Sequence, residues 1–137
     1  MPEDERKVFI DIIHEFDSVL KDGAYMLIEG CNRYETRYLN SLMDCKEIVE
    51  AAGAKRVLIV NDGGAYLAEL MATIRASIEA AGLVWMEMEE KATSPRLSLV
   101  MKGVEFVREN NIDFILAVGG GTVMDTAKAI GIIINNP

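Results

Sequence analysis

The sequence is poor in the side chains that most often bind metals, with one histidine and two cysteines among 137 residues. A site with two or more imidazole ligands cannot be built from one copy of the chain, because His14 is the only histidine. Cys31 and Cys45 lack a C-x-x-C spacing, which argues against a zinc site and a disulfide framework. We expect reduced thiols in a cytoplasmic protein, and a solvated His14 on the polar face of a helix.

The sequence also lacks long apolar runs and an excess of basic residues over acidic ones. No apolar run approaches the roughly 20 residues that cross a bilayer, and the acidic residues 1–9 are unlike a signal or transit peptide. Lys and Arg number 14 against 22 Asp and Glu, whereas a nucleic-acid partner requires a basic face. Half of the residues are apolar and 26% are charged, as in a folded globular chain. We therefore expect neither a membrane nor a nucleic acid as a partner.

The first third of the chain favours helices. Apolar residues at i, i+3 and i+4 spacing predict a helix over residues 3–21 and another over residues 36–52. Between them, the apolar residues 24–28 are compatible with a short strand. We therefore expect residues 1–25 to form an N-terminal helical extension.

From residue 56 onward, predicted strands alternate with predicted helices. The strands cover residues 57–60, 83–88 and 114–118. The helices cover residues 65–81, residues from 93–95 to about 109, and residues from about 122 onward. Such alternation implies right-handed crossovers, so we predict an α/β fold with a partial Rossmann-like parallel sheet and flanking helices. Trp85 is expected in the core and residues 87–91 at a solvated strand end.

Three adjacent glycines follow the last predicted strand. Gly119, Gly120 and Gly121 lack the Cβ atoms that keep a ligand away from the backbone, and Thr122 opens the next helix. We call residues 119–122 the glycine-rich loop. Backbone N–H groups and the helix dipole favour an anion such as a phosphate there. The run matches neither G-x-G-x-x-G nor a Walker A motif, and a tight turn without a ligand is the alternative.

Asp62 follows the first buried strand of the predicted sheet. Ligands of open α/β sheets collect at the carboxyl ends of the strands. A carboxylate at this point accepts hydrogen bonds from a ribose diol and repels a 2′-phosphate. The alternative is an Asx turn or cap, which aspartate often forms.

Residues 56–137 resemble the N-terminal nucleotide-binding domain of the iron-containing (group III) alcohol dehydrogenases. That family carries a Gly-Gly-Gly-Ser/Thr-x-x-Asp-x-x-Lys run, which is matched here by the glycine-rich loop, Asp125 and Lys128. The resemblance implies that this loop holds the pyrophosphate of NAD, and that Asp62 holds the adenosine ribose and favours NAD over NADP. It also implies that Asp125 and Thr126 lie beside the cofactor and partly organise the loop. Ser94 replaces an asparagine with which the family contacts the cofactor.

The resemblance further implies reversible hydride transfer between nicotinamide and a small alcohol or aldehyde, with Fe²⁺ or another divalent metal as Lewis acid. In the family, the metal ligands come from a helical C-terminal domain that supplies an Asp and three His. Because these 137 residues lack that domain, we expect no catalytic residue and no metal ligand among them, and no activity of the chain alone. Residues 26–137 would then be a truncated dinucleotide-binding α/β domain.

A rival interpretation is a free-standing α/β module that binds a nucleotide or acts as an assembly or regulatory partner. An open parallel sheet edge invites pairing with another chain, so we expect a homo-oligomer.

Overall fold

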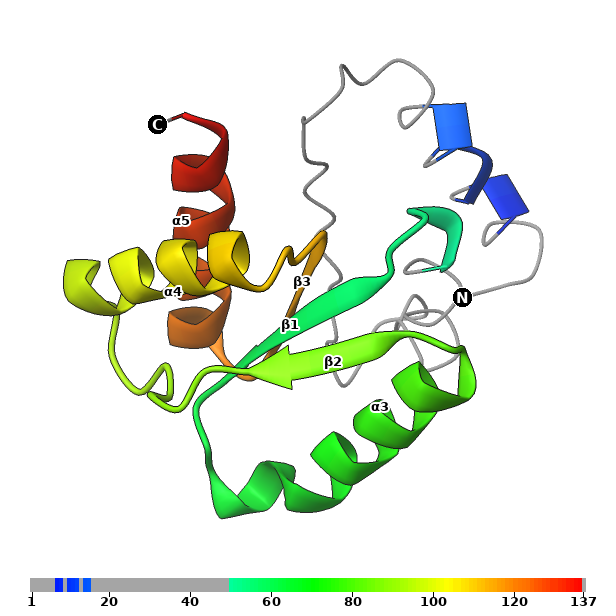
Figure 1. The fold of residues 1–137 in the computed structure, drawn as a ribbon. Coiled ribbons are helices and arrows are strands. Elements are labelled where there is room, and N and C mark those ends of the chain that lie inside the picture. The colour runs from blue at the N-terminus through cyan, green and yellow to red at the C-terminus, as the bar shows by residue number, and fades with distance from the viewer. Residues whose placement is uncertain (1–6, 9, 13, 16–49, 137) are drawn as a thin grey trace. The chain divides into compact units, whose positions relative to one another are not determined.

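The computed structural model describes residues 7–8, 10–12, 14–15 and 50–136 (Figure 1). The chain divides into two compact units, Met1–Ala54 and Lys55–Pro137. In the first unit, the described residues up to 15 are helical, and His14 is exposed as predicted. Most of the two predicted N-terminal helices, both cysteines and the expected boundary at residue 25 lie outside the described residues. None of the described helices has the length and apolar character needed to span a membrane.

The second unit is built on a three-stranded parallel sheet (Figure 1). Its strands are β1 (Arg56–Asn61), β2 (Val84–Glu87) and β3 (Phe114–Val118), in the order β2-β1-β3. Residues 57–60 of the central strand are at most 1% exposed, which is typical of a strand covered on both faces. The predicted α/β fold with a parallel sheet is confirmed.

Helices cover both faces of this sheet (Figure 1). A 3₁₀ turn (Ala65–Leu67) leads into α3 (Ala68–Ala80), which lies on one face. On the other face lie α4 (Leu97–Glu109) and α5 (Gly121–Asn135). Side chains alternate between the two faces of a strand, so β1 contributes to both apolar layers. The largest buried cluster joins β1, α4 and α5 and contains Leu58, Val60, Met88, Ala92, Leu99, Val100, Val104, Val107, Ile112, Val123, Ala127 and Ile130.

The start of α4 differs from the prediction. The helix begins at Leu97 instead of residues 93–95, and its N-cap residue is Arg96 in an extended conformation. Pro95 disfavours the helical conformation of the residue before it, which explains why Ser94 stays outside the helix. Leu97 and Met101 are 71% and 42% exposed, whereas Leu99 is fully buried.

Candidate functional site

The strand order places two loops of interest at one edge of the sheet. The chain passes from β1 to β2 on one side and then crosses to β3 on the other side of β1. The carboxyl ends of β1 and β3 are therefore neighbours, and Asn61 is the register partner of Val118. Asp62 and Gly119 follow these two residues directly. Such a switch point is where open α/β sheets bind their ligands.

Within the glycine-rich loop, the first glycine is required by the fold. Gly119 has a φ of +153°, which side chains rarely adopt. A Cβ atom added there would lie 2.7 Å from Cγ2 of Val123. The conformation and the packing of the turn are therefore enough to explain why residue 119 is glycine.

Neither a positive φ nor a steric contact requires glycine at the other two positions. Gly120 has a φ of −84°, and Gly121 is the first residue of α5. A Cβ atom at either position would meet nothing within 4 Å. The fold therefore accepts a side chain at both positions, and the glycines leave open space directly in front of the backbone.

The open space lies at the N-terminus of a long helix. No side chain caps α5, because its N-cap residue is Gly120. The first N–H groups of a helix have no partner within that helix, and they carry the positive end of its dipole. Gly121 is exposed and Thr122 is half-buried, so both are accessible to an anion. The loop thus has the geometry and the polarity of a phosphate site.

The two residues that follow on α5 differ in exposure. Asp125 is exposed. Thr126 is 1% exposed, and its hydroxyl donates to the carbonyl of Thr122 at 2.8 Å. The Thr126 hydroxyl is thus bound within the first turn of α5, and the place of Thr126 beside a cofactor stays a prediction.

Asp62 forms an Asx turn, as its alternative interpretation predicted, but its carboxylate stays accessible. Its Oδ1 accepts the N–H of Gly64 at 2.9 Å, and its Oδ2 accepts the hydroxyl of Tyr66. These two hydrogen bonds, that of Tyr66 first, hold the pKa of Asp62 below its ordinary value of 3.8. Asp62 is therefore a carboxylate at neutral pH, as a ribose acceptor must be.

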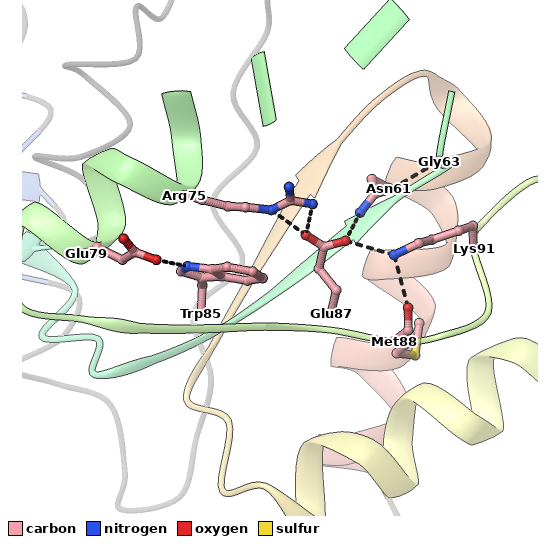
Figure 2. A network of polar contacts seen from close by, with 8 residues as sticks. All are labelled: Asn61, Gly63, Arg75, Glu79, Trp85, Glu87, Met88 and Lys91. Carbon is pink, nitrogen blue, oxygen red and sulfur yellow. Dashed lines mark hydrogen bonds and ion pairs between the residues drawn. The ribbon is translucent and has the colours of Figure 1, made fainter. Parts of the chain in front are cut away.

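Glu87, at the end of β2, was missed by the sequence analysis. We expected a solvated strand end, but the side chain of Glu87 is only 11% exposed. Its Oε1 accepts the guanidinium of Arg75, with 2.9 Å from Nε (Figure 2). Its Oε2 accepts Nζ of Lys91 at 2.8 Å and Nδ2 of Asn61 at 3.1 Å. A signal was present, because a strand that turns Trp85 toward α3 turns Glu87 to the same face.

Charge and hydrogen bonding keep Glu87 ionised. Burial alone would raise the pKa of Glu87, but the hydrogen bonds from Lys91, Arg75 and Asn61 together outweigh it and lower the pKa below 4.5. The same face carries Trp85, which is half-buried, not fully in the core as we expected. Its indole N–H donates to Glu79 at 2.8 Å, and the Arg75 guanidinium lies 5.0 Å from the ring centroid (Figure 2).

The Glu87 network also positions the turn that contains Asp62. Oδ1 of Asn61 accepts the N–H of Gly63 at 2.9 Å, while its Nδ2 donates to Glu87 (Figure 2). A Cβ atom on Gly63 would lie 3.0 Å from Cγ of Lys91, so the Lys91 stem packs on this turn. The main chain adds a further tie, because the N–H of Ala92 donates to the carbonyl of Asn61 at 2.9 Å. Glu87 thereby acts on the candidate site through Asn61 and Lys91.

Two further site predictions concern Ser94 and metal ligands. Ser94 lies among the exposed residues 93–96 before α4, and its contact with a cofactor stays a prediction. Among the residues that the structure describes, no three His, Cys, Asp or Glu side chains are grouped so that they could hold a metal ion.

Comparison with known proteins gives consistent matches. Residues 37–137 match the family model of iron-containing alcohol dehydrogenases. Lactaldehyde reductase of Escherichia coli (strain K12) is 35% identical over 89 residues, which cover 65% of this chain and 23% of the relative. A probable NADH-dependent butanol dehydrogenase 1 of Bacillus subtilis (strain 168) is 43% identical over 77 residues, 56% of this chain and 20% of the relative. The chain thus spans between a fifth and a quarter of the length of these curated relatives.

A solved structure agrees with the fold. NADH-dependent butanol dehydrogenase A from Thermotoga maritima superimposes with a TM-score of 0.58 at 24% identity, over 79% of this chain and 27% of that chain. The triple-glycine motif, the parallel sheet and the family match all point to the same family. The chain therefore belongs to the iron-containing (group III) alcohol dehydrogenase family, of which it represents the N-terminal portion.

Proposed function

We propose that Asp62 and the glycine-rich loop form the dinucleotide site of an NAD-linked, cytoplasmic alcohol dehydrogenase of the iron-containing family. One observation carries this proposal. Gly120 and Gly121 are glycine at positions where the turn and the packing accept a side chain. Gly121, inside the first turn of α5, lowers helix stability relative to alanine, and close approach of a ligand to the backbone explains why a glycine is there.

Each residue of the site has a role in binding. The N–H groups of Gly121 and Thr122 would donate to the pyrophosphate, with the Thr122 hydroxyl as a further donor. Asp62 would accept the hydroxyls of the adenosine ribose, and its charge would repel the 2′-phosphate of NADP. Asp125 and Ser94 would border the cofactor. The bound nicotinamide would supply the hydride acceptor or donor, and relatives named as NADH-dependent support this choice of nucleotide.

The substrate and the metal are part of the same proposal. We propose a small alcohol or aldehyde, such as propanediol or lactaldehyde, because a lactaldehyde reductase is among the relatives. The described residues do not fit a metal centre, so we assign no reaction step to a metal here. We expect these 137 residues alone to reduce no NAD in the presence of propanediol and Fe²⁺. Metal-dependent formation of NADH by the purified chain would contradict this expectation.

Calorimetric titration with NAD and NADP tests the site. Gly121→Val should weaken NAD binding at least tenfold, because its side chain fills the space in front of the N–H groups. Gly121→Ala should raise the urea midpoint of unfolding while it weakens NAD binding, because alanine favours the helix and obstructs the ligand. Gly131→Ala is the matched control on the same helix, since a Cβ there also meets nothing within 4 Å.

The two readouts together decide the outcome. The control should leave NAD affinity unchanged. Equal NAD affinity in wild type and Gly121→Val, or no binding of NAD by the wild type, would overturn the proposal. Tighter binding of NADP than of NAD would overturn the role of Asp62.

A second candidate function is assembly, and one observation favours it. Within the described part of the chain, β3 pairs only with β1, so its outer edge presents main-chain groups to which another strand can add.

A further inference from the structure

Tyr66 covers the carboxylate that the proposed function assigns to ribose. It lies in the 3₁₀ turn before α3, and 71% of the residue is exposed. Its hydroxyl donates to Oδ2 of Asp62. Its ring rests on the backbone of Gly64, where an added Cβ atom would lie 2.3 Å from Cε1 of the ring. Gly64 therefore provides the space for a tyrosine that reaches back to Asp62.

The two hydrogen bonds to Asp62 differ in how easily they can be exchanged. The N–H of Gly64 is part of the backbone turn, and its bond to Oδ1 at 2.9 Å is fixed with that turn. The Tyr66 hydroxyl is on a side chain that solvent surrounds, and rotation of the side chain removes it without unfolding the turn. Oδ2 is therefore the oxygen that an incoming hydroxyl group can take over.

We propose that Tyr66 gates the ribose site: in the nucleotide-free chain its hydroxyl occupies Oδ2 of Asp62, and an adenosine ribose binds by displacing it. This inference rests on the proposed function, and it names the group with which the ribose competes. The ribose hydroxyl and the phenol are both neutral O–H donors, so the exchange replaces one hydrogen bond with another of the same kind.

The electrostatics of the pair keep the Tyr66 hydroxyl a donor to an ionised Asp62. The Tyr66 bond is the largest cause of the lowered pKa of Asp62, and the same bond raises the pKa of Tyr66 above 10.0. The phenol therefore stays protonated at neutral pH and remains a donor.

The test compares NAD affinities in a double-mutant cycle. Tyr66→Phe keeps the ring on Gly64 and removes the donor, so it should bind NAD about fivefold tighter than the wild type, a typical value for one hydrogen bond. In an Asp62→Asn background, Tyr66→Phe should produce a much smaller gain, because the carboxylate for which the two donors compete is gone. Inorganic pyrophosphate, which has no ribose, should bind wild type and Tyr66→Phe equally.

The outcomes separate the gate from the site. Equal or weaker NAD binding by Tyr66→Phe overturns the gate, and sensitivity of NAD binding to Gly121→Val then leaves the proposed function standing. The same gain for pyrophosphate as for NAD also overturns the gate, because it would show a general change in the loop. No NAD binding by the wild type overturns the proposed function and, with it, the gate.

Discussion

Glu87 and Glu90 are three residues apart, and each binds two cationic side chains, but they lie in different surroundings. Glu87 contacts Arg75 and Lys91 with a side chain that is 11% exposed. Glu90 contacts Arg96 and Lys102 with a side chain that is 34% exposed. Ion pairs in solvent contribute little to stability, whereas a buried charge that loses its partner is costly. Only Glu87 also holds a buried amide, that of Asn61.

The two glutamates therefore form a matched pair for a stability test. Glu87→Gln should lower the free energy of unfolding by about 1–2 kcal/mol, because it leaves Arg75 and Lys91 without their carboxylate. Glu90→Gln should leave the urea midpoint nearly unchanged. Urea unfolding of the three chains followed by circular dichroism measures both effects, with the slope checked for constancy. Equal losses in the two variants would show that burial of the Glu87 network adds no stability.

The lowered pKa of Glu87 predicts how the stability of the chain changes in acid. The pKa of Glu87 is lower in the folded chain than its ordinary value of 4.5. The stability that its charge contributes is therefore complete above that ordinary value, and it is lost as the pH falls through the lower pKa of the folded state. Below pH 4.5 the wild type should lose stability more steeply than Glu87→Gln, which has no carboxylate to protonate. Parallel curves of unfolding free energy against pH for the two chains would contradict this assignment.

At the scale of elements, α4 and α5 approach each other at one glycine. Gly103 is buried in α4, and a Cβ atom there would lie 2.3 Å from Cδ1 of Ile130, which is fully buried in α5. Leu99 and Val104 lie with Gly103 on the buried face of α4, whereas Leu97 and Met101 are exposed. The glycine-rich loop begins α5, so the contact also fixes the helix that carries the candidate phosphate site.

Gly103→Ala should therefore destabilise the chain by about 1–3 kcal/mol, because the added methyl group overpacks the α4–α5 contact. Gly131→Ala, also inside a helix but with nothing near the new Cβ, should be neutral or stabilising by up to about 1 kcal/mol. Shortening the opposing side chain with Ile130→Val should recover part of the loss in Gly103→Ala. Urea midpoints measure all four chains, and a neutral Gly103→Ala would show that the helices shift freely.

Residue patterns predicted the elements of residues 56–136 better than the contacts between them. The buried run 57–60 and the strand 114–118 were predicted because β-branched apolar runs have few other uses. The inward direction of Glu87 was not, because a charged residue at a strand end usually faces solvent. The Tyr66–Asp62 bond was also missed, since four residues of separation predict a contact only where a helical turn is known to form.

At the scale of the whole unit, the candidate site follows from topology. Asp62 and Gly119 are far apart in sequence, and alternation of strands and helices alone predicted that they share the carboxyl edge of the sheet. The order β2-β1-β3 adds that they follow neighbouring strands. The order could not be predicted from residue patterns, because β2 and β3 are both short strands and nothing in their residues assigns either one to a particular side of β1.

The same order predicts how the chain associates. The outer edge of β3 is open within the described residues, and four of its five residues are half-buried, so we expect reversible dimers in sedimentation velocity. Leu116→Lys should shift the chain toward the monomer, because a lysine on an edge strand opposes strand pairing. Val84→Lys is the matched control on β2 at the opposite edge, where Val84 is 45% exposed, and it should leave the dimer intact. A wild type that stays monomeric at high concentration would overturn edge pairing, and loss of the dimer in Val84→Lys alone would transfer the interface to β2.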